Sequence, residues 1–532
     1  MSALTGTGAL VRLALRRDRL RLPIWVVVIP GLVTATASAI VELYPTMGER
    51  LALGLAIGAN PALRALTGPI FDPSSAGGLT AWRVTGVAAV LTSLLSVLFV
   101  TRHTRAEEET GRAELIGAGT VGRHALPAAA VLVAGAANLA VALLSALGLA
   151  TRGLPVSGAL AFGLSVAGTG WVFTGVAALT AQLTETARAA NAIALAVLGL
   201  AFLLRAAGDA ADGDTLSWLS PLGWAQRVRA FADERWTVFA LFAVAAAALS
   251  AVAHLLAGRR DVGTGLLSSR RGPATAAPRL SGPTALAWRL HRGVLLGWVL
   301  AFAVVGAVFG ALALSVGDIV DDNPQLAALM AGFGGAGAVV DAFLATVMSL
   351  LGMVAAGYAV QAALRPRAEE VAARAEPVLA AAVSRWRWPA GHLVWALGGA
   401  TTVLAVAGLA AGLAHGIRVG DPAGQALRIT GAALAQAPAV WVMAGVAVLL
   451  FGFVPRLTSL AWAVLGAFVL LGQLGRLLGI DERIQDLSPF AHLPRVPGGE
   501  ATFGPLAWLV VVAAALVLAG LAGFRRRDLT GG

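Results

Sequence analysis

The chain has 532 residues, of which 58% are hydrophobic and only 13% are charged. Soluble domains average about 45–50% apolar and about 25% charged residues, so much of this chain must face something other than water. The sequence has no cysteine, which excludes disulfides and thiolate metal sites. The net charge is +11 and all 39 basic residues are arginines. They cluster at the ends of apolar runs, a distribution typical of residues that set the orientation of a membrane protein rather than of residues that bind nucleic acid.

Long apolar stretches recur along the chain, and a transmembrane helix needs about 20 such residues. We predict about twelve spans and an all-α polytopic membrane protein in two six-helix halves, 1–257 and 286–532, joined by a linker at 258–285 that is rich in Arg, Gly, Ser and Pro. The predicted spans are 22–42, 79–101, 125–150, 158–183, 189–206 and 236–257 in the first half, and 297–317, 342–364, 390–415, 427–453, 457–478 and 505–524 in the second.

The arginines also predict an orientation. If the N-terminus is cytoplasmic, the cytoplasmic segments carry about twice as many arginines as the outer ones, as the positive-inside rule requires. Both termini are then expected in the cytoplasm. Residues 9–22 place Arg12, Arg16 and Arg19 on one stripe and leucines on another, which predicts an interfacial amphipathic helix. Ala37-Ser38-Ala39 resembles a signal-peptidase site, but the apolar run continues past it.

The two halves carry the same short motifs in the same order, at an offset of about 262–273 residues. The even number of spans per half makes these repeats parallel, related by an axis along the membrane normal. The pairs are Arg16, Arg19 and Trp25 with Arg289, Arg292 and Trp298; Asn60-Pro61 with Asn323-Pro324; Arg105-Ala106-Glu107-Glu108 with Arg367-Ala368-Glu369-Glu370; Leu219-Ser220-Pro221 with Leu487-Ser488-Pro489; and Arg259-Arg260-Asp261 with Arg526-Arg527-Asp528.

Charged loops follow the second span of each half, at 102–124 and 365–388, and we call them the first and second acidic loops. On a continuous helix Glu108 would pair with Arg112, and Glu370 with Arg374, in the favourable i,i+4 order. Glu107 and Glu114 would share one face, as would Glu369 and Glu376. Each loop therefore predicts a short cytoplasmic helix that presents its acids outward. This helix is either a solvated loop or a docking site for a partner.

Polar residues inside the spans are few. Asn138, Gln182 and Gln361 are expected to form hydrogen bonds between helices, and Gly306 and Gly310 to permit close helix contacts. A proton-coupled pump usually needs an acid deep in the membrane, and the sequence shows no clear one. A P-loop requires a lysine, which the chain lacks. These observations favour energy supplied by a separate ATPase that docks on the acidic loops.

Residues 104–115 read Thr-Arg-Ala-Glu-Glu-Glu-Thr-Gly-Arg-Ala-Glu-Leu, and Arg-Arg-Asp-Val-Gly-Thr-Gly follows the sixth span at 259–265. With six spans per half and an amphipathic leading helix, the chain resembles permeases of ABC-2 type exporters. It is similar over its whole length to the fused twelve-span actinobacterial group identified as polyketide-antibiotic or multidrug exporter permeases. The second acidic loop departs from the first, because Val371, Ala372 and Ala373 replace Glu109, Thr110 and Gly111.

The resemblance implies a transport subunit of the bacterial inner (cytoplasmic) membrane that moves lipophilic small molecules outward. It also implies two copies of a P-loop ATPase as partners, which bind ATP and Mg, and no cofactor on this chain. The implied ATPase-coupling residues are Arg105, Glu107, Glu108, Gly111, Arg112, Glu114, Arg367, Glu369, Glu370, Arg374 and Glu376. The implied cargo path runs along spans two, five, eight and eleven, with Phe99, Asn191, Met348, Met353 and Phe468 as expected path residues.

Two other classes remain open at this point. A secondary transporter of the twelve-span kind also has parallel halves, but it would need ion-coupling groups at mid-membrane. A membrane enzyme or scaffold is the third class. An enzyme of this kind usually has clustered acids or histidines near one membrane interface, whereas the seven histidines of this chain are scattered. The sequence does not name the cargo.

Overall fold

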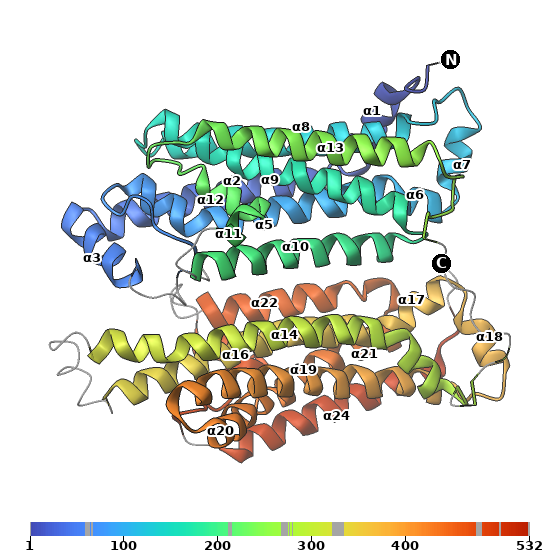
Figure 1. The fold of residues 1–532 in the computed structure, drawn as a ribbon. Coiled ribbons are helices and arrows are strands. Elements are labelled where there is room, and N and C mark those ends of the chain that lie inside the picture. Colours follow the sequence, from blue (N-terminus) through green and yellow to red (C-terminus); the bar gives the residue numbers. More distant parts are fainter. Residues whose placement is uncertain are drawn as a thin grey trace. The chain divides into compact units, whose positions relative to one another are not determined.

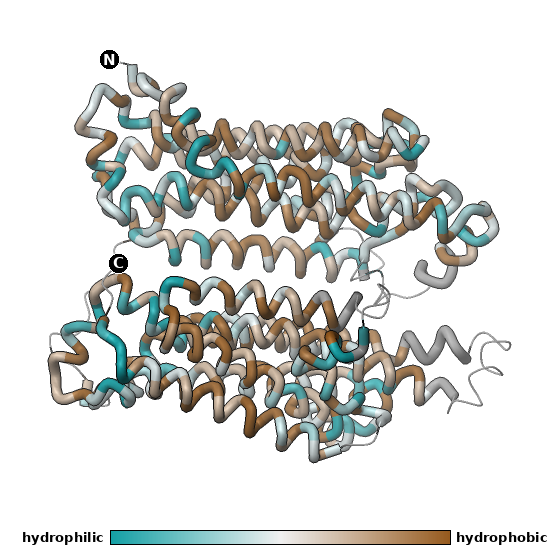
Figure 2. The backbone as a smooth tube through the Cα atoms, turned by 180° about the vertical axis from the view of Figure 1, so that it is seen from behind, coloured by the Kyte–Doolittle hydropathy of each residue, from teal (hydrophilic) through white to brown (hydrophobic). Residues whose placement is uncertain are grey.

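The computed structural model describes residues 2–58, 64, 67–210, 215–267, 275, 277–278, 280–321, 335–474, 481–499 and 502–529. The chain divides into two compact units, Met1–Gly272 and Pro273–Gly532. Each unit is a bundle of long helices joined by short segments at its two ends (Figure 1), and the described residues contain no strand. Apolar residues run along the helices and hydrophilic residues gather at their ends (Figure 2).

The first unit contains thirteen of the described helices. They are α1 (Thr7–Arg17), α2 (Arg21–Leu43), α3 (Met47–Gly58), α5 (Ala76–His103), α6 (Arg105–Glu109), α7 (Arg112–Gly117), α8 (Ala125–Ala150), α9 (Val156–Leu183), α10 (Ala187–Ala210), α11 (Thr215–Trp218), α12 (Pro221–Arg227), the 3-10 helix η1 (Trp236–Val238) and α13 (Phe239–Ala257).

The second unit repeats this plan with twelve described helices. They are α14 (Pro283–Asp321), α16 (Gly335–Ala363), α17 (Arg365–Val371), α18 (Ala375–Ala380), α19 (Arg387–Val419), α20 (Pro422–Leu434), α21 (Ala437–Phe453), η2 (Pro455–Leu457), α22 (Leu460–Leu474), α23 (Glu482–Gln485), η3 (Pro489–His492) and α24 (Phe503–Arg526).

Eleven helical segments in the described residues are long and apolar enough to cross a membrane. The prediction of an all-α polytopic membrane protein is therefore confirmed. The remaining predicted span, 457–478, corresponds to the shorter α22, whose apolar part is Leu460–Val469. Residues 475–480 at its predicted end lie outside the described residues, as does the repeated Asn-Pro pair of each half.

The amphipathic leading helix differs between the halves. In the first half it ends at Arg17, earlier than the predicted 22, and a turn at Asp18–Leu20 separates it from the span α2. In the second half the corresponding segment and the span form one helix, α14, of 39 residues. The first leading helix is thus a separate element that must be held by contacts of its own.

Small residues permit close helix packing in the second unit, as predicted. A methyl group at Gly306 or Gly310 of α14 would collide with the backbone of Ala407 or Ala411 in α19. Glycine therefore lets the two helix backbones approach more closely than any other residue would, which is a common way to associate helices in lipid. Asn138 also has its predicted role, since its Nδ2 donates to Ser96 Oγ of α5 at 3.0 Å.

The predicted span 427–453 is interrupted. Ala435 and Gln436 form a turn between α20 and α21, whereas the related span α9 of the first half is one unbroken helix. Pro438 lies in the first turn of α21 and has no N–H to donate to the carbonyl of Leu434. The interruption has a local cause in the sequence that the hydropathy pattern does not reveal.

Candidate functional site

Both acidic loops lie at the end of their half where the second long helix ends (Figure 1). The first loop is not one helix. Gly111 has φ +71°, a left-handed conformation that glycine adopts without strain, and it separates α6 from α7. The second loop breaks in the same way at Ala373, with φ +54°. The prediction of a single short helix in each loop is therefore wrong, and residues seven apart no longer share a face.

Glu108 of the first loop is held by arginine side chains. Arg260, which follows α13, donates from Nη1 and Nη2 to its two carboxylate oxygens at 2.7 and 2.6 Å. Arg105 also pairs with Glu108, and the backbone N–H of Gly263 donates to it at 3.2 Å. Arg105 and Arg260 both donate to the carbonyl of Thr264. The segment after the sixth span is therefore bound to the loop after the second span.

The second half repeats this arrangement with its own residues. Arg527, which follows α24, donates to both oxygens of Glu370 at 2.6 and 2.8 Å. Arg367 pairs with the same carboxylate at 3.2 Å. The bidentate pairing of a guanidinium with a carboxylate fixes both groups in one plane. Two motifs that the sequence repeats separately, the acidic loop and the Arg-Arg-Asp segment, thus contact each other in each half.

The neighbouring acids are also buried. Glu107 is 3% exposed, and its carboxylate lies 2.6 Å from Arg17 of α1 and 3.3 Å from Arg112. In the second half Glu369 is 7% exposed and pairs with Arg365 at 2.8 Å and with Arg374 at 3.9 Å.

The prediction that the loops present these acids outward is therefore wrong, because folding turns them toward arginines. The i,i+4 pairs predicted for Glu108 and Glu370 are likewise replaced, because the break after each acidic helix brings Arg112 to Glu107 and Arg374 to Glu369.

Other residues form the exposed surface of the loops. In the first loop Glu114 and Arg112 are exposed and Leu115 is 78% exposed. In the second loop Arg374 and Glu376 are exposed. The expected coupling residues therefore divide into two groups. The first group is buried or half-buried in ion pairs and comprises Arg105, Glu107, Glu108, Arg367, Glu369 and Glu370. The second group lies at the surface and comprises Arg112, Glu114, Arg374 and Glu376, although Arg112 and Arg374 still pair with Glu107 and Glu369.

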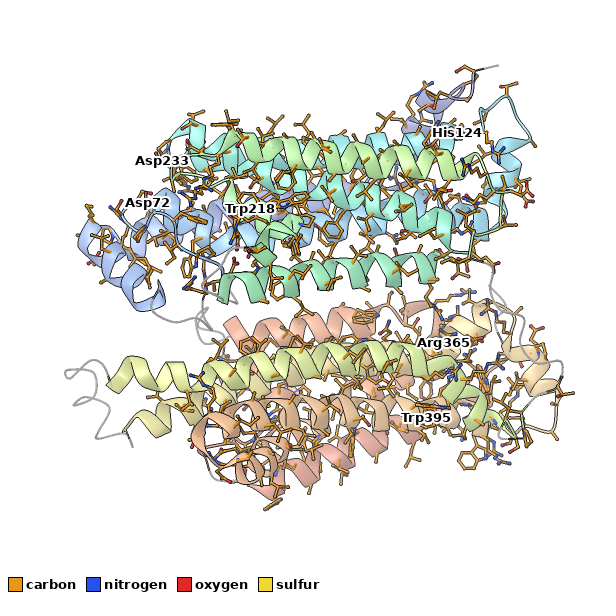
Figure 3. The ribbon with its side chains drawn as sticks, viewed as in Figure 1. Asp72, His124, Trp218, Asp233, Arg365 and Trp395 are labelled. Carbon is orange, nitrogen blue, oxygen red and sulfur yellow. The ribbon has the colours of Figure 1, made fainter. Side chains whose placement is uncertain are left out.

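The leading helix α1 is fixed to the first acidic loop by Asp18. This carboxylate is 3% exposed, and it lies 2.6 Å from His103 Nε2 and 3.2 Å from Arg102 Nε. At the repeat offset the residue corresponding to Asp18 is His291, which contacts His392 at 3.0 Å. Arg365, the first residue of the second acidic loop, lies at the end of the second half that carries this loop (Figure 3). The two halves therefore hold their leading segments by different chemistry.

The structure separates the expected path residues. Phe99 is buried and packs against the ring of His103, Met348 is buried in the core of the second half, and Phe468 packs against that core. Asn191 is partly exposed near the start of α10. Of the five, only Met353 lines a large cavity, which has a volume of about 1220 Å³ and lies within the second half.

Sequence reasoning missed a buried charge network at the opposite end of the first half. Asp209 is 1% exposed, and its carboxylate lies 3.5 Å from Arg205 and 3.2 Å from Arg227. Ser217 Oγ donates to it at 2.8 Å. The i,i+4 spacing of Arg205 and Asp209 at the end of a span was the available signal.

Comparison with known proteins supplies the family. The family described as the C-terminal domain of the multidrug efflux system permease Rv1217c matches residues 9–256 and 280–525, one segment in each half. The chain belongs to this family of multidrug efflux permeases. The multidrug efflux system permease protein Rv1217c of Mycobacterium tuberculosis is 46% identical over 529 residues, which cover 99% of this chain and 96% of the relative. The prediction of a multidrug exporter permease is confirmed, and the chain is a membrane transport protein.

Proposed function

We propose that this efflux permease is driven by a separate ATPase that binds its two acidic loops. The observation that carries the proposal is the duplicated loop that is fixed to the segment after the last helix of its half by a bidentate ion pair. A loop held in this way transmits a displacement to the helices on both sides of it, because packed elements and ion pairs have low compliance. A freely solvated loop would absorb the same displacement.

The lack of lysine supports the proposal, since the chain has no P-loop of its own. The complex would contain this chain, two copies of a P-loop ATPase that binds ATP and Mg, and no nucleic acid. The loops, both termini and the linker would lie in the cytoplasm of a bacterium, and the spans in its inner membrane. The cargo would be lipophilic small molecules such as antibiotics.

The exposed acids of the loops provide the test of docking. Reversing Glu108 and Glu370 would break internal ion pairs, so its effect on docking could not be separated from misfolding. Glu114→Arg with Glu376→Arg changes only exposed positions. We expect this double variant to fold normally, to lose co-purification of the ATPase, and to lose ATP-dependent drug efflux from cells.

Glu42→Arg is the matched control, because it reverses an exposed acid at the other end of the first half. This control should retain efflux. Full efflux in the Glu114/Glu376 double variant would refute docking at these acids. Efflux that survives ATP depletion but collapses with a protonophore would refute the ATPase and favour an ion-coupled transporter.

A further inference from the structure

Two tryptophans meet at the surface of the second half, where α14 and α19 pack side by side. Trp288 of α14 packs against Trp395 of α19 with ring centroids 4.4 Å apart, and Trp288 is 41% exposed. The indole N–H of Trp395 donates to the carbonyl of Thr284 at 3.0 Å, which ties the start of α14 to α19. Trp395 lies toward the end of the half that carries the second acidic loop (Figure 3). Tryptophan is enriched where a membrane meets water, so this pair marks the level of the lipid headgroups.

Exposed arginines adjoin the tryptophan pair. Arg289 and Arg292 follow Trp288 on α14, and their spacing of three and four residues places all three side chains on neighbouring positions of one helix face. Arg387 adds a third exposed guanidinium at the start of α19. Within the described part of the chain, none of these arginines forms an ion pair. An unpaired guanidinium matches phosphate, because its planar N–H groups can donate to two phosphate oxygens at once.

The same face of α14 continues as leucines. Leu296 and Leu300 follow Arg292 at intervals of four residues, and they are 58% and 59% exposed. From Arg292 to Leu300 the helix rises roughly 12 Å at 1.5 Å per residue, and α14 is long and apolar enough to cross the bilayer. A phosphate-binding group followed by an exposed apolar stripe has the chemical order of a phospholipid, in which acyl chains follow the phosphate.

The first half has the arginines without the rest of this arrangement. At the repeat offset the arginine pair recurs as Arg16 and Arg19, whereas Leu15 takes the place of Trp288. The helix that carries Arg16 is also separate from its span, whereas α14 continues into its span without a break. Positive charge is therefore common to both halves, and only the second half joins it to an aromatic pair and a continuous apolar stripe.

We propose that Trp288, Arg289 and Arg292 bind the headgroup of one anionic phospholipid, whose acyl chains lie along Leu296 and Leu300. The unpaired arginines select an anionic headgroup, because the choline of a zwitterionic lipid is a cation that they repel. The orientation proposed above places this lipid in the inner leaflet. Binding itself rests neither on that orientation nor on the ATPase.

Native mass spectrometry of the purified full chain tests the site, because it counts the lipids that stay bound. The chain is titrated in detergent with dioleoyl-phosphatidylglycerol or with dioleoyl-phosphatidylcholine, which has the same acyl chains. We expect one phosphatidylglycerol to bind at least several times more tightly than phosphatidylcholine. Free glycerol 3-phosphate should not displace it, because this anion lacks the acyl chains.

Arg289→Gln with Arg292→Gln should weaken binding of this one lipid about 10–30-fold, the contribution of two arginines near an anionic surface. Trp288→Leu introduces the residue of the first half and should weaken it several-fold. Arg16→Gln with Arg19→Gln is the matched control, since it removes the same two charges at the equivalent positions, and it should leave this lipid bound. All of these positions are exposed, so melting temperatures measured in phosphatidylcholine should not fall.

Three results would overturn the proposal. Equal binding of the two lipids would remove the selectivity for an anionic headgroup. An equal loss in the control pair would show that positive charge attracts lipid without a built site. Displacement by glycerol 3-phosphate would assign the arginines to a soluble phosphate instead. Loss of the lipid in a variant that retains ATP-dependent efflux would leave both this proposal and the proposed function standing, because the two are independent.

Discussion

Glu108 and Glu370 occupy equivalent positions, and each is neutralised by the arginine that follows the last helix of its half. Their side chains are only 12% and 2% exposed. A carboxylate this far from water is tolerated when charged donors satisfy it. Each is paired with two arginines, one from its own loop and one about 150 residues away in sequence. The burial of these acids therefore reflects positioning of the loop rather than direct contact with a partner.

Arg260→Ala should destabilise the first half. The variant removes two charge-assisted hydrogen bonds from a buried carboxylate but leaves Arg105 beside it, so we expect a loss of about 1.5–3 kcal/mol. Denaturant unfolding of the purified chain measures this loss. Arg525→Ala, at an exposed position in the last turn of α24, should change stability by less than about 0.5 kcal/mol. An Arg260→Ala variant as stable as the Arg525→Ala control would contradict the positioning role.

At the scale of elements, the leading helix α1 is fixed to the first acidic loop at both ends. Just before the helix the carbonyl of Thr5 accepts from the Gly122 N–H at 2.9 Å, and side-chain ion pairs follow at its last turn. Arg17 reaches Glu107 and Asp18 reaches His103, while Leu10 packs against Ala125 and Ala129 of α8. The rest of α1 is largely exposed, with Leu13 and Leu15 more than 40% exposed. The helix is therefore anchored to the loop at both ends and presents apolar and basic side chains on its exposed face, as an interfacial helix does.

Asp18→Asn should loosen α1 without unfolding the bundle. Loss of the charge weakens the contacts with His103 and Arg102, so the amides of residues 7–17 should exchange faster with deuterium, whereas those of α8 should not change. Arg19→Gln alters an exposed neighbour and should leave exchange as it is. Unchanged protection of α1 in Asp18→Asn would show that its apolar contacts are sufficient.

Hydropathy predicted the long helices because a membrane span needs about 20 consecutive apolar residues, and such a run can be recognised locally in the sequence. The internal repeat also located both acidic loops. The pairing of Glu108 with Arg260 was not predictable in this way, because it joins residues 152 apart. The breaks at Gly111 and Ala373 depend on single φ angles, and they decide which acids turn inward. The Asp209 network also needs Arg227 and Ser217, which reach this carboxylate only through tertiary packing.

At the scale of the whole molecule, the arginines predict an orientation in the membrane, and this orientation can be measured directly. The chain has no cysteine, so a single introduced cysteine is the only thiol. Leu115→Cys and Met47→Cys place exposed thiols at opposite ends of the first half. We expect a membrane-impermeant maleimide to modify Met47→Cys in intact cells and Leu115→Cys only in inside-out vesicles, because the positive-inside rule puts the acidic loops in the cytoplasm. The reverse pattern would invert the proposed orientation.

The pairing of each acidic loop with the end of its half also sets an order of assembly during synthesis. Glu108 is made 152 residues before Arg260, and Glu370 is made 157 residues before Arg527. At about 5–20 residues per second, each carboxylate emerges roughly 8–30 s before its distant partner. Both partners of the first bidentate pair thus exist before the second acidic loop has been translated. Each ion pair forms only when all the spans of its half have been made, and so it marks the completion of that half.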